Sequence, residues 1–220
     1  MSRRSLAALS AAVLLVLTGC SDDDGDTAED QPNDPDAAEC QYPEAGEPAK
    51  EVQPPDNLAA DAGDVSVTIE TSAGQLDATL DGAAAPCTVN SFTSLAGQGY
   101  FDGTTCHRLT TEGILVLQCG DPTASGMGGP GYTIPDEVDG EETYPAGTLA
   151  MAKTSQPDSG GSQFFVVYDD TELPPEYTVF GTIDEASIEA VRAVAAEGTA
   201  EGGPDGAPKT PVEIESVSIG

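Results

Sequence analysis

The sequence predicts a mainly β fold, a closed antiparallel barrel with a helix at each end. Short runs of alternating apolar and polar residues recur between turns rich in glycine and proline. Only two stretches have helical periodicity. Short strands leave exposed edges unless their sheet closes on itself, so a barrel is favoured, and a two-sheet sandwich is the alternative.

The chain begins with a segment typical of an exported lipoprotein. Arg3 and Arg4 precede an apolar run that ends in Leu-Thr-Gly-Cys at Cys20. The run is too short to span a bilayer, and small residues before a cysteine are typical of the cleavage site of bacterial lipoproteins. We therefore expect residues 1–19 to be removed and a lipid on Cys20 to hold the protein at the outer face of the cytoplasmic membrane. The alternative is a secreted protein with a free thiol at position 20.

Residues 20–62 differ in composition from the rest of the chain. They are rich in Asp, Glu, Pro, Ala and Gly, with Lys50 as their only base. Such a segment buries too little apolar surface to fold, and its like charges repel one another. We therefore predict a disordered acidic tether over 20–62 and a single domain over 63–220.

The charge balance excludes one class of partner. The chain has 39 acidic residues and seven Lys or Arg, a net charge of −32. Such a surface repels phosphates, so we expect no nucleic-acid binding. Against this background Arg108 and Lys153 stand out, because both lie in apolar or glycine-rich segments. The chain has one histidine and no CxxC pair, which argues against a metal site and against a dithiol redox motif.

The first part of the predicted domain contains a hairpin, a helix and a second pair of strands. Two alternating runs at 65–69 and 75–80 form the hairpin, and Pro86 starts the helix. The second pair covers 104–110 and 114–119, and repeated turns follow it. Three more strands, a helix and a closing strand are predicted at 148–152, 163–168, 178–183, 185–196 and 212–219, respectively.

Four cysteines remain after Cys20, and an even number in an exported chain indicates two disulfides with three possible pairings. If the loop between the strands at 104–110 and 114–119 has two residues, Cys106 lies across from Cys119 at a separation that a disulfide can bridge. Cys40 is then left to pair with Cys87.

Three segments carry the most specific pattern, namely 100–109 (YFDGTTCHRL), 117–121 (LQCGD) and 159–165 (SGGSQFF). In order and spacing they resemble the core motifs of the cyclophilins, and the similarity covers about 65–219. The resemblance implies an eight-stranded antiparallel β-barrel capped by two helices, no cofactor, and isomerisation of the peptide bond before proline in extended peptides.

Arg108 matches the family's catalytic arginine. Rotation about the X-Pro bond breaks amide resonance, which costs roughly 18–20 kcal/mol. A guanidinium that donates to the prolyl nitrogen as it pyramidalises stabilises the twisted state more than either planar state. The simpler interpretation of Arg108 is an ion pair with one of the many acids.

The other site residues follow from the same match. Gln118 and Gln163 match glutamines that hold the substrate backbone and orient the arginine, so Gln118 is predicted to be catalytic together with Arg108. The two-residue loop above would place Gln118 on the opposite face from Arg108, so a bulge or a wider turn is expected. The proline pocket is predicted to consist of Leu115, Val116, Phe165, Leu173 and Tyr177. The strip that pairs with the peptide is predicted to be Ala152, Lys153 and Thr154.

The pocket departs from the family pattern at several positions. Leu115 and Val116 replace Phe and Met, Lys153 replaces an amide, Tyr177 replaces an imidazole, and the chain has no tryptophan. Burial as ordinary core is the simpler interpretation of Phe165 and, with more force, of the aliphatic residues. These departures put high-affinity cyclosporin binding in doubt more than catalysis.

The sequence therefore predicts a monomeric peptidyl-prolyl isomerase that assists the folding of exported proteins. Its partners would be proline-containing peptides and unfolded exported proteins, and it would contact the membrane only through its lipid. A second hypothesis is a proline-peptide-binding module or cell-envelope chaperone with weak catalysis. A third, a redox protein built on Cys106 and Cys119, is not favoured by their spacing.

Overall fold

The computed structural model describes residues 37–59 and 63–220. The predicted leader, the lipidated Cys20 and the first part of the predicted tether lie outside these residues. Within the described part of the chain, no helix is both long enough and apolar enough to cross a membrane.

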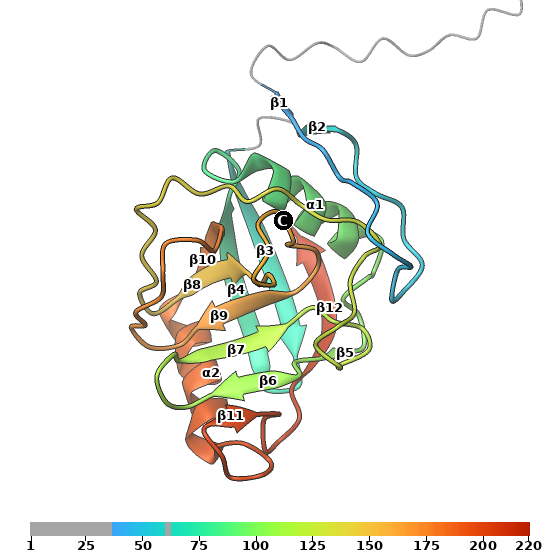
Figure 1. Ribbon diagram of the computed structural model, residues 1–220. Helices are drawn as coiled ribbons and strands as arrows, with labels where there is room; N and C mark the ends of the chain where they lie inside the picture. Colours follow the sequence, from blue (N-terminus) through green and yellow to red (C-terminus); the bar gives the residue numbers. More distant parts are fainter. Residues whose placement is uncertain (1–36, 60–62) are drawn as a thin grey trace, which may run out of the picture. The chain divides into compact units, whose positions relative to one another are not determined.

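Ten antiparallel strands form the main sheet, in the order β11-β6-β7-β9-β8-β10-β4-β3-β12-β5 (Figure 1). These strands are β3 Asp64–Thr71, β4 Gly74–Asp81, β5 Thr104–Thr105, β6 Arg108–Thr110, β7 Val116–Cys119, β8 Thr148–Met151, β9 Phe164–Val167, β10 Val179–Ile183, β11 Asp205–Gly206 and β12 Glu213–Ile219. The two helices are α1 Pro86–Gly97 and α2 Glu185–Glu197, near opposite ends of the sheet in Figure 1.

The sheet closes through the chain itself. β5 and β6 are two parts of one predicted strand, interrupted at Cys106 and His107. β5 pairs with β12 and β6 pairs with β7, so the interruption joins the two ends of the sheet. With β5 and β6 counted as one strand and the two-residue β11 set aside, eight strands surround the core. The predicted eight-stranded barrel with two helices is confirmed.

The helix α1 closes one end of the barrel with an aromatic side chain. Phe92 packs against the rings of Phe101, Phe164 and Phe180, with centroid distances of 4.9 to 5.5 Å. Pro86 fits the start of this helix because its missing N–H has no partner there in any case. The carboxylate of Glu137 accepts the next two backbone N–H groups, each at 2.8 Å.

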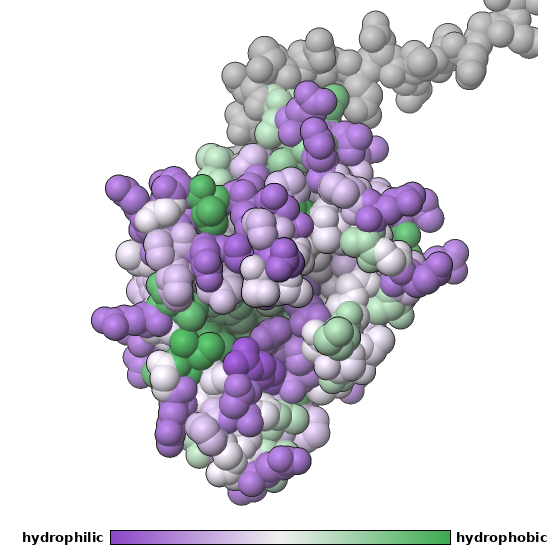
Figure 2. Space-filling model, viewed as in Figure 1, coloured by the Kyte–Doolittle hydropathy of each residue, from purple (hydrophilic) through white to green (hydrophobic). Residues whose placement is uncertain are grey.

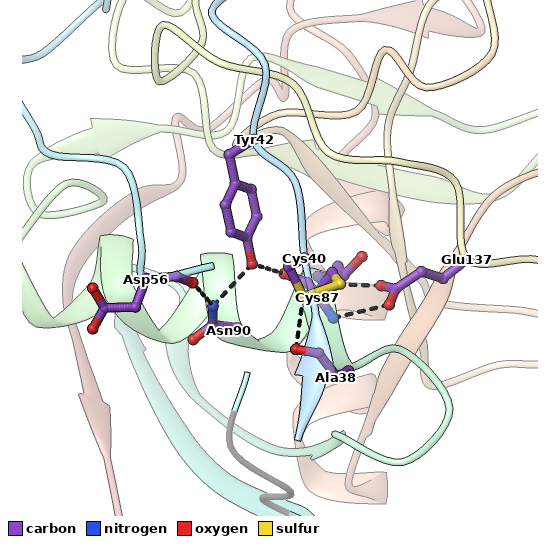
Figure 3. The surroundings of a disulfide bond; sticks show 8 residues. Ala38, Cys40, Tyr42, Asp56, Cys87, Asn90 and Glu137 are labelled. Carbon is purple, nitrogen blue, oxygen red and sulfur yellow. Dashed lines mark hydrogen bonds between the residues drawn. A yellow bond between two sulfur atoms is a disulfide. The ribbon is translucent and has the colours of Figure 1, made fainter. Parts of the chain in front are cut away.

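Residues 37–59, which we call the strap, are folded against the domain. Its short strands β1 Ala38–Glu39 and β2 Leu58–Ala59 pair with each other, and Cys40 is 1% exposed. The prediction that the tether extends to residue 62 is therefore wrong for the strap. A disulfide and backbone hydrogen bonds hold the strap (Figure 3), and Tyr42 and Val52 pack against the core of the domain.

Both predicted disulfides are present, Cys40–Cys87 with a Cα–Cα distance of 5.4 Å and Cys106–Cys119 with 4.0 Å. The two-residue loop used to predict the second pair is wrong. Arg108 pairs directly with Gln118, so a five-residue loop at 111–115 separates β6 and β7. This wider turn places both side chains on one face of the sheet.

Candidate active site

A hollow of about 420 Å³ lies on the outer face of the barrel wall. Its floor belongs to an apolar cluster that includes Val116, Phe165 and Val167. Figure 2 shows apolar surface in the region of β7 and β9, with hydrophilic residues beside it. Eight of the eleven predicted catalytic and binding residues line the hollow, and they are Arg108, Val116, Gln118, Ala152, Lys153, Phe165, Leu173 and Tyr177.

Arg108 reaches this hollow from the first position of β6. Its Nε and Nη2 donate to the two carboxylate oxygens of Asp205, at 2.9 and 2.7 Å. Nη1 donates to Oε1 of Gln118 at 3.3 Å. The hydrogen bonds with Asp205 raise the pKa of Arg108, so the guanidinium stays charged. Arg108 therefore forms an ion pair and also lines the pocket. Two of its five guanidinium N–H groups remain free to bind a ligand.

A row of hydrogen bonds continues from Arg108 along the wall. Gln118 Nε2 donates to Gln163 Oε1 at 2.9 Å, and Gln163 Nε2 donates to the carbonyl of Gly128 at 2.9 Å. Each amide thus accepts from one neighbour and donates to the next. The row fixes the orientation of both glutamines and, through Gln118, of one edge of the guanidinium.

The apolar part of the hollow has aromatic walls. Phe165 is 4% exposed and packs edge-to-face with Tyr177 at a centroid distance of 5.7 Å. The backbone N–H of Tyr177 donates to the hydroxyl of Tyr144 at 3.0 Å, which holds this wall in place. Leu173 packs against the same cluster. The result is a narrow apolar slot beside a cation.

Lys153 lines the pocket and forms an ion pair with Asp136. Its Nζ lies 2.7 Å from Oδ2 of Asp136, and the two side chains are only 11% and 14% exposed. Nζ also lies 6.0 Å from the centre of the Tyr177 ring. Because Asp136 compensates the ammonium group, Lys153 adds a neutral pair rather than a free charge.

Three predicted residues lie outside this hollow. Leu115 packs against the barrel core, while Ile114 faces the hollow in its place. The prediction of Leu115 as a pocket residue is wrong because neighbouring side chains on an extended segment point to opposite faces. Thr154 and Gln163 border the adjacent hollow described below.

The loop that follows β7 forms a further wall, which our sequence analysis did not identify. Asp121 is fully buried and accepts hydrogen bonds from the backbone N–H groups of Thr123, Ser125 and Gly128, at 2.7 to 3.1 Å. Burial alone would raise the pKa of Asp121, but the Thr123 hydroxyl and the backbone N–H groups of Gly128 and Thr123 lower it to about 2. The loop places Ser125 and Gly126 at the hollow. The mixture of Asp, Thr, Ser and Gly is typical of such a turn and was the available signal.

His107 and Asp205 were also missed. Both ring nitrogens of His107 are buried without a hydrogen-bond partner among the described residues, and burial lowers its pKa. His107 lines the hollow beside Arg108. Asp205 lies 97 positions after Arg108, in a glycine- and proline-rich segment, so no local pattern connects the two.

A larger hollow of about 940 Å³ lies elsewhere on the domain. Carboxylates line it, among them Asp81, Glu137 and Glu142, and the described residues around it include no arginine and no aromatic side chain. Within the described ranges, no group of three His, Cys, Asp or Glu side chains could hold a metal ion. We therefore place the candidate active site in the smaller hollow.

Comparison with protein families shows which known proteins this fold is similar to. Residues 66–219 match the family described as cyclophilin type peptidyl-prolyl cis-trans isomerase. The chain belongs to the cyclophilin family. The strap, including Cys40, precedes the matched residues of this cyclophilin and is therefore an addition to the family domain.

Related cyclophilins include two mycobacterial proteins. The chain is 48% identical over 196 residues to "Probable peptidyl-prolyl cis-trans isomerase B" of Mycobacterium leprae, covering 82% of this chain and 66% of that protein. It is 46% identical over 200 residues to the protein of the same name from Mycobacterium tuberculosis, covering 83% and 64%. The chain thus spans slightly less than two thirds of the length of these relatives.

A solved cyclophilin has the same architecture. The crystal structure of a Cryptosporidium parvum cyclophilin type peptidyl-prolyl cis-trans isomerase superposes with a TM-score of 0.62 at 28% identity. The match covers 71% of this chain and 98% of that structure.

Proposed function

We propose that this cyclophilin is an active peptidyl-prolyl cis-trans isomerase whose central residue is Arg108. One observation supports the proposal above all others. The guanidinium of Arg108 lines the same hollow as Phe165, with two N–H groups left over after its bonds to Asp205 and Gln118. A cation and an apolar slot are thus adjacent, as catalysis at an imide nitrogen requires.

The chemistry follows from this arrangement. The prolyl ring packs against Phe165 and Val116, while the chain before it remains free to turn. As the bond twists, the prolyl nitrogen loses its conjugation and gains a lone pair, which Arg108 stabilises by donating a hydrogen bond. The planar cis and trans states have no such lone pair, so the interaction is made mainly in the transition state. A preorganised donor of this kind contributes about 10²- to 10³-fold in rate.

The substrates are extended peptides and proteins that contain proline. A structure of the related Cryptosporidium parvum cyclophilin was solved in the presence of the dipeptide Ala-Pro. In this chain, Ala152 and Gln163 border the hollow or its neighbour and provide polar backbone and amide groups beside the slot. Such groups bind a peptide backbone irrespective of most of its side chains.

We further propose that the clients are exported proteins and that a lipid on Cys20 holds the enzyme outside the cytoplasmic membrane. The Leu-Thr-Gly-Cys sequence supports this location. The two disulfides, one within the domain and one between the strap and α1, support it as well, because such bonds persist mainly in oxidising compartments. Loss of incorporated labelled fatty acid in Cys20→Ser would support the lipid, and undiminished labelling would contradict it.

The activity is tested with four proteins. NMR exchange spectroscopy on a proline tetrapeptide measures cis-trans interconversion for the wild type, Arg108→Ala, Arg108→Lys and Arg192→Ala. Arg192 is a matched control, since it bonds Glu189 at 2.8 Å from α2 and lies outside the hollow. We expect kcat/KM to fall about 10²-fold in Arg108→Ala and by most of that factor in Arg108→Lys. Arg192→Ala should have the kcat/KM of the wild type.

An inactive but folded wild type would contradict the proposal. If that sample still binds the peptide in a titration, the chain is a proline-peptide-binding module instead. Equal activity in Arg108→Ala and the wild type would show that another group carries the reaction.

A further inference from the structure

A second hollow, of about 300 Å³, adjoins the proline slot. The two share the side chains of Gln118 and Lys153 on their common border. The far wall of the second hollow includes Ala45 and Glu47 of the strap, which precedes the family domain. The strap is therefore part of the surface that a peptide in the slot would meet next.

Backbone hydrogen bonds fix the strap at this wall. The N–H of Ala45 donates to the carbonyl of Gly131, and the N–H of Ala49 donates to that of Gly129, each at 2.8 Å. A Cβ placed on Gly131 would lie 3.1 Å from the ring of Pro48, so the glycine allows the strap to approach closely. Glu47 lies between these two hydrogen-bonded positions.

The strap is also fastened on both sides of Glu47. On one side the Cys40–Cys87 disulfide ties it to α1, and the hydroxyl of Tyr42 donates to the carbonyl of Cys87 at 2.9 Å (Figure 3). On the other side the ammonium group of Lys50 donates to three carbonyls in the 99–102 turn. The backbone at Glu47 is thus held in place rather than free to move away.

The charge of the second hollow comes from Glu47. Glu47 and Lys153 are the only charged residues among those that line it in the described chain. Lys153 is paired with Asp136 at 2.7 Å, whereas Glu47 forms no ion pair within residues 37–59 and 63–220. A ligand therefore meets one uncompensated negative charge. Glycines 126, 128, 129 and 131 add no side chains to the wall, which leaves room for a long side chain.

We propose that Glu47 is a specificity-determining residue that favours peptides carrying a lysine or arginine within a few residues of the proline. An extended peptide advances about 3.3 Å per residue, so residues next to a proline in the slot lie over the second hollow. A long cationic side chain there pairs with the carboxylate of Glu47. This inference rests on the proposed isomerase function, because it assumes that proline occupies the slot.

The test measures a ratio of rates with the full chain. Peptides that differ only by Lys or Gln, placed in turn at each position within three residues of the proline, are compared by NMR exchange. For the wild type we expect kcat/KM for Lys to exceed that for Gln by about two- to fivefold at one position. The ratio should fall to about 1 in Glu47→Gln and below 1 in Glu47→Lys.

Glu51→Gln is the matched control, since Glu51 is an exposed strap carboxylate outside both hollows. It removes the same charge from the strongly acidic chain, so it should keep the wild-type ratio if the effect is local. About 0.5 M salt should reduce the ratio, because exposed charges are screened.

Two results would overturn the proposal: a wild-type ratio near 1 at every position, or an equal fall in Glu47→Gln and Glu51→Gln. Either result with normal turnover of the Gln peptides would leave the isomerase function intact. Absence of turnover for all peptides would instead contradict that function.

Discussion

Strands β7, β8 and β9 carry two apolar clusters on opposite faces. The inner cluster includes Leu117, Leu149 and Phe164, and the outer cluster includes Val116, Ala150 and Phe165. Successive side chains of a strand alternate between faces, so a step of one residue moves a side chain from the barrel core to the candidate active site.

The two clusters are closed to different degrees. Phe164 is 1% exposed and touches the rings of Phe92, Phe101 and Phe180. Phe165 is also buried, but one side of its cluster opens to the hollow. The same side-chain type thus serves stability at one position and, as we propose, substrate binding at the next.

The sharpest test of this comparison is Phe164→Ala. The cavity left inside the ring cluster should lower the free energy of unfolding by about 3–5 kcal/mol. Urea unfolding followed by circular dichroism measures the loss. A loss below about 1 kcal/mol would show that the inner cluster does not depend on this ring.

Phe165→Ala should separate binding from stability. The proline ring loses its largest apolar wall, so kcat/KM should fall about 10- to 100-fold. The free energy of unfolding should fall less than in Phe164→Ala, because the truncated side chain opens to solvent rather than to a closed cavity. Both kcat/KM and the free energy of unfolding are measured on one preparation of each variant. Equal stability losses in the two variants, with kcat/KM unchanged in Phe165→Ala, would show that the two clusters do not differ in function.

Asp121 lies behind the outer site and is expected to be sensitive to acid. The pKa of Asp121 in the folded protein, about 2, lies well below the ordinary value of an aspartate. The ionised carboxylate therefore contributes about 2 kcal/mol of stability above roughly pH 4, and this contribution is lost as the pH falls toward 2. Asp121→Asn should unfold more easily than the wild type at pH 7, with a difference that shrinks in acid. A constant difference would contradict this origin, and the exposed Glu112→Gln should change little at either pH.

Asp205→Asn should give the smallest effect on stability. The ion pair with Arg108 is 37% and 51% exposed, so its loss should cost less than about 1 kcal/mol. The guanidinium would lose the partner that orients two of its nitrogens, and kcat should fall by about three- to tenfold with peptide affinity unchanged. Asp205→Glu should restore part of the rate. An unchanged kcat would show that the ion pair between Arg108 and Asp205 does not contribute to catalysis.

The inner cluster was easier to predict than the outer site. Alternation and turn residues are local, so both helices and the strands of the domain other than the two-residue β11 were placed within a few residues of their bounds. The same alternation, applied to 114–116, would have selected Ile114 and excluded Leu115. The family resemblance assigned the pocket residues position by position, without regard to the face of the strand on which each side chain lies.

The strap and Asp205 depend on contacts that local patterns do not show. The strap is held by a disulfide, by backbone hydrogen bonds and by a few side chains such as Tyr42 and Lys50, so its mainly polar composition gave no sign of order. Asp205 is one of 39 acids, and only the tertiary fold brings it to Arg108. Composition indicates how much apolar surface a segment can bury, but it does not indicate disulfides or ion pairs between distant residues.

The closure of the sheet through Cys106 and His107 has a consequence for handling unfolded chains. A sheet with a long open edge would offer its own N–H and C=O groups to any extended segment and could recruit a client as an extra strand. Among the described strands, the ends of the main sheet are the two-residue β5 and β11. An unfolded chain therefore finds no long template for strand pairing on this sheet, so an extended segment bound at the proposed site can leave without becoming an added strand.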